Sequence, residues 1–128
     1  MATTTSEKET STLIASSKVN GTSVFNSAGE SVGSIDDIMI DKISGKSAYA
    51  VVSWGGFLGI GSDYYPVPWS ALKYDRALGG YVTNMTKDRL QDAPSFKGDT
   101  DPGWGNRDYE TRLHDVYGAE PYWGSMAR

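Results

Sequence analysis

The chain has 128 residues and a mass of 13.9 kDa, enough for one ordinary domain with tails but too little for two separate cores. It has no cysteine, which excludes disulfides, thiolate metal sites and a cysteine nucleophile. Twelve basic and sixteen acidic residues give a net charge of -4, which disfavours a nucleic acid as partner because backbone phosphates attract clustered Lys and Arg.

Composition divides the chain into three zones. Residues 1–11 are rich in Thr, Ser and Glu and are predicted to be a disordered tail. Residues 12–96 carry short apolar runs separated by turn residues, which predicts a β-rich domain, and residues 97–128 form an aromatic-rich extension. We find neither a signal-peptide pattern nor about 18 consecutive apolar residues, so we expect no membrane span and a cytoplasmic location.

Within the central zone the pattern predicts short strands and one short closing helix. Pro66 and Pro68 cannot donate to a ladder, so their strand is expected at a sheet edge or a bulge. The helix is expected to begin at Thr86, an N-cap residue. The class is therefore all-β, a small barrel of about six strands. The expected strands lie in residues 22–26, 32–41, 47–56, 63–69, 69–75 and 79–84.

The extension is predicted to contain a short helix between Asn106 and Gly118. Four apolar residues form one stripe on it, namely Tyr109, Leu113, Val116 and Tyr117. A stripe this short is not stable alone, so the helix must pack on the barrel, on a second copy or on another protein.

The spaced glycines of "WGGFLGIGSDYYPVPW" invite a nucleotide-loop interpretation, which the context excludes. A phosphate loop needs Lys-Ser/Thr or a helix after its last glycine, and here two prolines and a strand pattern follow Gly61. We interpret Gly56, Gly59 and Gly61 as a bend between strands.

Three acidic residues lie close together in the sequence. Neighbours on a strand point to opposite faces, so Asp36 and Asp37 are not expected to form a pair. Asp37 and Asp41 share a face but lie about 13 Å apart by strand rise, too far to act on one bond. We therefore interpret these carboxylates as solvated.

His114 is the single histidine and lies in the extension. One imidazole without cysteine gives weak support to a metal site or a catalytic triad, so we predict no enzyme, no catalytic residues, no metal and no cofactor. A cleft holding His114 beside an acidic residue would favour an enzyme instead.

The aromatic residues are the remaining functional signal, because such side chains commonly anchor interfaces. They pack either on their own barrel or on a second copy or partner, and both alternatives stay open. RNA stacking is a third, disfavoured by the lack of interleaved basic residues. The candidate protein-interaction residues are Trp54, Phe57, Leu58, Trp104, Tyr109, Tyr117, Tyr122 and Trp123.

Three stretches together resemble the PRC-barrel domain, which occurs in the photosynthetic reaction centre H subunit, in a bacterial ribosome maturation factor and in stand-alone bacterial proteins. They are "VGSIDDIMID", "GGFLGIG" followed by "VPWSAL", and "LQDAPSF", and the similarity runs from about Leu13 to Phe96. It implies a barrel that binds or assembles proteins and supplies no catalytic residues. Among matching residues, Gly33, Pro68 and Trp69 are interpreted as structural.

The resemblance favours a non-enzymatic interaction or assembly module whose partner is a protein or a second copy, hence a homo-oligomer. No small-molecule substrate is evident. The alternative is an accessory factor associated with RNA or the ribosome. Because a barrel of this size has room only for side chains, function is expected on its outside. Its interior is expected to hold Val24, Ile35, Val51 and Val67.

Overall fold

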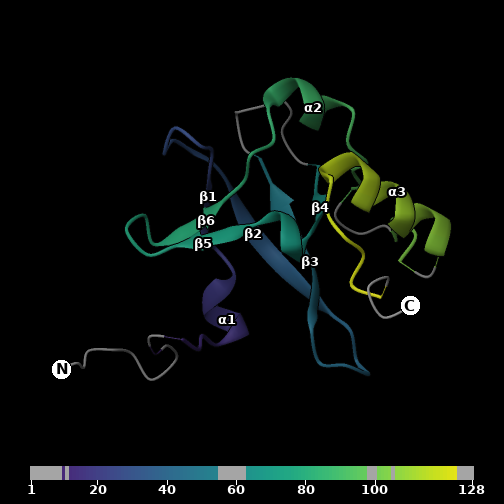
Figure 1. Ribbon diagram of the computed structural model, residues 1–128, viewed down its shortest axis with the longest axis horizontal. Coiled ribbons are helices and arrows are strands. Elements are labelled where there is room, and N and C mark those ends of the chain that lie inside the picture. The colour runs from purple at the N-terminus through teal and green to yellow at the C-terminus, as the bar shows by residue number, and fades with distance from the viewer. Residues whose placement is uncertain (1–9, 11, 55–62, 98–100, 105, 124–128) are drawn as a thin grey trace.

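The structure, a computed structural model, describes residues 10, 12–54, 63–97, 101–104 and 106–123 (Figure 1). The predicted disordered tail falls almost entirely outside these residues. The elements, in chain order, are α1 (Ser16–Val19), β1 (Ser23–Phe25), β2 (Ser31–Ile40), β3 (Ser47–Ser53), β4 (Tyr65–Pro68), the 3-10 turn η2 (Trp69–Ala71), β5 (Lys73–Asp75), β6 (Gly80–Val82), α2 (Lys87–Gln91) and α3 (Arg107–Tyr117).

The six strands form one sheet in the order β4-β3-β2-β1-β6-β5, which confirms the predicted mainly-β class. All neighbouring pairs are antiparallel except β1 and β6, where Val24 lies beside Tyr81 in a parallel pair. The long strands β2 and β3 form a hairpin whose tip projects beyond the other strands (Figure 1). We call residues 40–46 the hairpin tip.

The end strands β4 and β5 follow each other in sequence through η2, and no ladder joins them among the described residues. Strand β4 lies at the edge of the sheet, as its two prolines predicted. Pro66 and Pro68 pair with Val51 and Tyr49 of β3 on one side and offer no N–H to a further strand on the other.

Strand β3 is buried on both faces over its five central residues. Its residues Ala48, Ala50 and Val52 belong to the main core, where the predicted Val24, Ile35 and Val67 also lie. The alternate residues Tyr49 and Val51 point to the other face. The prediction that Val51 fills the barrel interior is therefore wrong, because strand alternation turns its side chain to the outer face.

Helix α3 covers this outer face. Its N-cap Asn106 accepts hydrogen bonds from the backbone N–H groups of Asp108 and Tyr109, and Gly118 ends it with φ 65°, as the sequence predicted. Leu113 is fully buried and Tyr117 is 5% exposed. Figure 1 shows the helix lying against β4, and the Arg89 guanidinium of α2 donates to the Val116 carbonyl at 3.1 Å. Of the alternatives left open, the structure shows the helix on its own barrel.

Strand β2 departs from regular alternation at Asp36. The register shifts between Ile35 and Asp37, so Asp36 is an extra residue in a bulge. As a result Asp36 and Asp37 line one shallow cavity of about 340 Å³ together with Trp104. The prediction that these two carboxylates face opposite sides is wrong, because the bulge breaks the two-residue period.

Candidate functional site

Tyr49 is the centre of the contact between β3 and the extension. Its ring centroid lies 5.5 Å from Trp104, 5.4 Å from His114 and 5.7 Å from Tyr122. Tyr49 itself is 2% exposed, so these aromatic contacts remove it almost fully from water. The packing fixes the extension on β3 through rings that are spread over 74 residues of sequence from Tyr49 to Trp123.

A buried hydrogen-bond network runs through the same contact. The Tyr49 hydroxyl donates to Glu110 Oε1 at 2.8 Å, and the Tyr122 hydroxyl donates to the same oxygen at 2.9 Å. His114 Nε2 lies 3.0 Å from the Tyr49 oxygen. Since the single Tyr49 proton is used toward Glu110, His114 Nε2 must be the donor in this arrangement. Glu110 and His114, only 5% and 3% exposed, thus share one phenol.

Burial favours the neutral forms of the Tyr49 phenol and the His114 imidazole. Burial raises the pKa of Tyr49 far above its ordinary value, and the carboxylate of Glu110 adds to the rise. Burial lowers the pKa of His114, although Glu110, Asp115 and the carbonyls of Ala119 and Glu120 favour its charged form. His114 Nδ1 is buried without a hydrogen-bond partner among the described residues.

A cavity of about 420 Å³ opens between this cluster and the hairpin tip. We call it the tip cavity. Its lining includes Tyr49, Trp104, Glu110 and Tyr122 on one side and Ile40 and Ile43 of the hairpin tip on the other. The tip isoleucines are unusually open, because Ile40 is 51% and Ile43 is 94% exposed. Large apolar side chains in this state commonly mark interaction surfaces.

Arg107 closes the outer side of the aromatic cluster. Its guanidinium carbon lies 3.8 Å from the ring centroid of Trp123 and 5.8 Å from that of Tyr122. A cation over an aromatic face is attracted by the electron density of the ring. Trp123 also packs edge-on against His114, with centroids 5.2 Å apart, so the end of the described chain is held in place.

Two predicted interaction residues are buried in their own chain. Trp54 is 2% exposed and packs against Tyr65, and Tyr117 is 5% exposed. Both rings therefore pack within their own chain, which is one of the two alternatives left open for the aromatic residues. Tyr109 is half-buried, and burial raises the pKa of its hydroxyl to about 12.

The other predicted residues divide into two groups. Trp104, Tyr122 and Trp123 are half-buried and lie around Tyr49 and His114, so the structure brings these three together. Phe57 and Leu58 lie outside the described residues.

Sequence reasoning did not single out Tyr49, Glu110, Ile40 or Ile43 as site residues, and it did not predict the burial of His114. Glu110 and His114 carried a usable signal. They lie one residue after Tyr109 and Leu113 respectively, beside the apolar stripe, at positions where a charged side chain is buried only if it is paired. A second usable signal was Ile43, because a large apolar residue is unusual inside a turn.

An enzyme would be favoured by a cleft that holds His114 beside an acidic residue. The structure places His114 beside Glu110, but the histidine does not line the tip cavity. His114 is 3% exposed, and the lining of the tip cavity includes Glu110 and Tyr49 without it. The lining of this cavity thus contains the Glu110 carboxylate and the phenols of Tyr49 and Tyr122 and does not contain the imidazole. The histidine thus serves the packing of α3 on β3.

The sequence pattern that defines the PRC-barrel domain matches residues 11–90. The chain belongs to the PRC-barrel family. A comparison with curated proteins finds no match. The matched residues of this PRC-barrel protein include Gly33, where a Cβ would lie 2.6 Å from the Ser53 carbonyl oxygen, which supports the structural interpretation of that glycine. In the part of the chain that the structure describes, no helix is long and apolar enough to cross a membrane.

Proposed function

We propose that this PRC-barrel protein is a non-enzymatic assembly module that binds a second copy of itself through the hairpin tip. The observation that carries the proposal is the exposure of Ile43, 94%, and of Ile40, 51%, at the end of a projecting hairpin. Removing two isoleucine side chains from water stabilises a contact by roughly 1.5 to 3 kcal/mol each when burial is complete.

A second copy fits the tip because its charges are self-complementary. Asp41 lies next to Lys42, and Lys46 follows on the return of the same turn. A two-fold interface places one patch against its own copy, so the Asp41 carboxylate of one chain can face a lysine of the other. The isoleucines then pack at the centre and the charges lie at the rim, as in ordinary interfaces.

The absence of an enzymatic activity is part of the proposal. Its support is that the single histidine of the chain is buried and committed to Tyr49, while the Tyr49 phenol is held by Glu110. A cytoplasmic location also stays a proposal, resting on the sequence pattern. The RNA-associated alternative stays a prediction, and the net charge of -4 weighs against it.

The test is the molar mass of the purified full chain by light scattering over a range of concentrations, compared with an Ile43→Asp variant. We expect the full chain to approach twice its monomer mass as concentration rises. The variant should stay monomeric or dimerise at least tenfold more weakly, because it places a charge at the apolar centre. Ile43 is almost fully exposed, so the substitution leaves the core intact.

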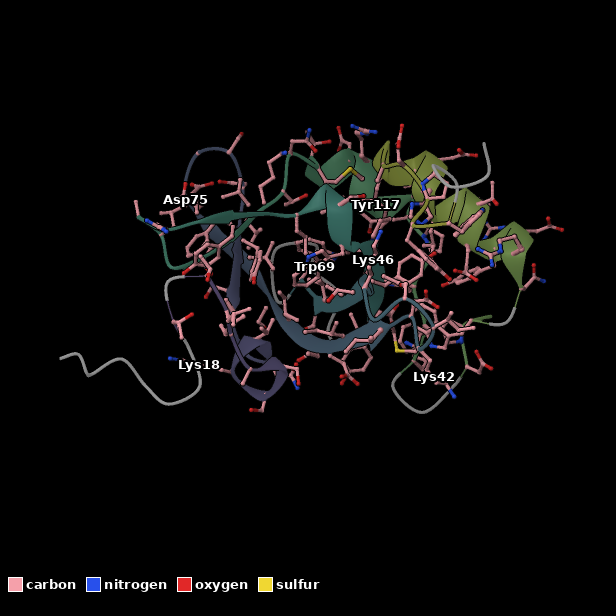
Figure 2. The ribbon with its side chains drawn as sticks, turned by 60° about the horizontal axis from the view of Figure 1, so that its bottom comes forward. Lys18, Lys42, Lys46, Trp69, Asp75 and Tyr117 are labelled. Carbon is pink, nitrogen blue, oxygen red and sulfur yellow. The ribbon has the colours of Figure 1, made fainter. Side chains whose placement is uncertain are left out.

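Leu78→Asp is the matched control. Leu78 is also an exposed apolar residue, 37% exposed, in the turn between β5 and β6. Figure 2 shows Lys42 of the hairpin tip and Asp75, the last residue of β5 before this turn, on opposite sides of the molecule. The control should dimerise like the unchanged chain. A monomeric full chain at all concentrations, or equal loss in both variants, would contradict the proposal.

A further inference from the structure

The tip cavity has the composition of a site for an organic cation. We infer that it binds an alkylated ammonium group, with Tyr49, Trp104 and Tyr122 as the aromatic walls and Glu110 as the buried carboxylate. All of these groups come from one chain, so the inference does not rest on self-association.

The aromatic geometry gives the first argument. Tyr49 forms the floor, since it is 2% exposed and contacts both half-buried rings. Trp104 is tilted by 41° against Tyr49, whereas Tyr122 stands edge-on to it at 89°. The three rings therefore line one cavity in different orientations. Faces of aromatic rings attract cations, and several rings around one cavity are the usual receptor for quaternary ammonium groups.

The charges give the second argument. Glu110 lines the cavity, is 5% exposed, and is held in place by the hydroxyls of Tyr49 and Tyr122. Asp41 adds a second carboxylate to the lining, and Lys42, which also lines it, opposes them from an exposed position. Arg107 over Tyr122 and Trp123 shows that this cluster already holds one cation by its ring faces.

The apolar lining selects the kind of cation. Met39, Ile40 and Ile43 line the same cavity and offer no side-chain acceptor, so the N–H groups of a simple ammonium ion that point toward them would lack a partner. Methyl groups on the nitrogen remove those donors and pack against the isoleucines. The volume of about 420 Å³ lies within the range of small-molecule sites. The ligand is thus either a small free quaternary ammonium compound or a methylated lysine side chain of a protein.

The first experiment titrates the full chain with choline and, separately, with 3,3-dimethylbutan-1-ol, in which carbon replaces the charged nitrogen. Binding is followed by calorimetry and by the NMR shifts of the aromatic protons. We expect choline to bind at least about tenfold more tightly than its neutral counterpart, since the ring faces and the Glu110 carboxylate attract only the charged compound. Equal affinity of the two compounds, or no binding of either, would overturn the inference.

Variants locate the site. Trp104→Ala and Glu110→Gln should each weaken choline binding about tenfold, and Trp104→Phe should restore most of it, because a ring face returns. Lys42→Ala should tighten binding, which a purely structural role of the cluster would not produce. Tyr74→Ala is the control, since Tyr74 is 49% exposed and lines other cavities. Circular dichroism checks that each variant is folded. Unchanged binding in Trp104→Ala would overturn the location.

A peptide carrying trimethyl-lysine and the same peptide with unmodified lysine distinguish the two sources of the ligand. Tighter binding of the methylated peptide than of choline would identify a protein-borne group, whereas binding of choline alone would identify a small molecule. Failure of the methylated peptide and of choline together would contradict the inference, whatever the molar mass of the protein.

Discussion

At the scale of single residues, the phenol of Tyr49 connects strand β3 to helix α3. Tyr49 donates to Glu110 and accepts from His114, so its hydroxyl gives His114 a partner and gives Glu110 a second donor beside Tyr122. A buried polar group without a partner costs more than the hydrogen bond itself contributes. The hydroxyl therefore decides whether the polar cluster stabilises the contact or weakens it.

Tyr49→Phe should lower the free energy of unfolding by about 1 to 3 kcal/mol, because Glu110 and His114, both almost fully buried, each lose a hydrogen-bond partner. Urea unfolding measures this change. Tyr74→Phe, in a half-exposed ring, should change stability by less than about 0.5 kcal/mol. Equal effects of the two substitutions would mean that the network adds nothing to stability.

Stability should also depend on the protonation of His114. Burial lowers its pKa in the folded chain, so the unfolded chain binds the proton more readily. The free energy of unfolding should therefore fall as the pH drops below about 6.5, with a slope of at most about 1.4 kcal/mol per pH unit. His114 is the single histidine and no cysteine is present, so no second imidazole and no thiol contributes to this pH dependence.

The control for this pH dependence is His114→Gln, whose stability should be flat between pH 7.5 and 5.5. Urea unfolding at several pH values measures both proteins. A slope of the same size in the variant would assign the effect to other groups.

The contacts of single side chains were the part of the structure that the sequence predicted least well. The apolar stripe Tyr109, Leu113, Val116 and Tyr117 was predictable from its spacing on a helix. The positions of Glu110 and His114 beside this stripe indicated burial only with a partner, and that partner could not be predicted, because Tyr49 lies 61 and 65 residues earlier in the chain. Burial of a charged side chain depends on a contact that only the folded chain brings together.

At the scale of elements, the helix α3 shows how local chemistry sets boundaries. Asn106 accepts from two backbone N–H groups at the start, and Gly118 takes a left-handed conformation at the end. Both boundaries were predictable, since capping depends on neighbours in sequence. The sequence did not predict which surface α3 covers. The unbroken apolar run Ala48–Val52 nevertheless is typical of a strand that is buried on both faces.

Asn106→Ala should lower the free energy of unfolding by about 1 kcal/mol, because two N–H groups of the first turn lose their acceptor. Thermal or urea unfolding measures the loss. The control Asn84→Ala, an exposed residue between β6 and α2, should have little effect. If removing Asn106 left stability unchanged, α3 would be held only by its packing on the sheet.

At the scale of the whole molecule, the extension is a layer of the fold and not a separate arm. It buries the outer face of β3, fills the space around Tyr49 and leaves the hairpin tip uncovered. The sequence predicted a domain and an aromatic extension but placed the interaction surface on the aromatics. In the structure, the described candidate rings are half-buried or buried in the chain itself, and the most exposed large apolar side chain is Ile43 of the hairpin tip.

Self-association through the hairpin tip is the central claim, and a spin-label distance tests it most directly. The chain has no cysteine, so Ile43→Cys carries one nitroxide label per copy, and Asp88→Cys on α2 provides the matched control. We expect a short distance with a narrow distribution between the two labels at position 43, and a longer distance between the two labels at position 88. Absence of dipolar coupling at position 43, or a shorter distance at position 88, would contradict it.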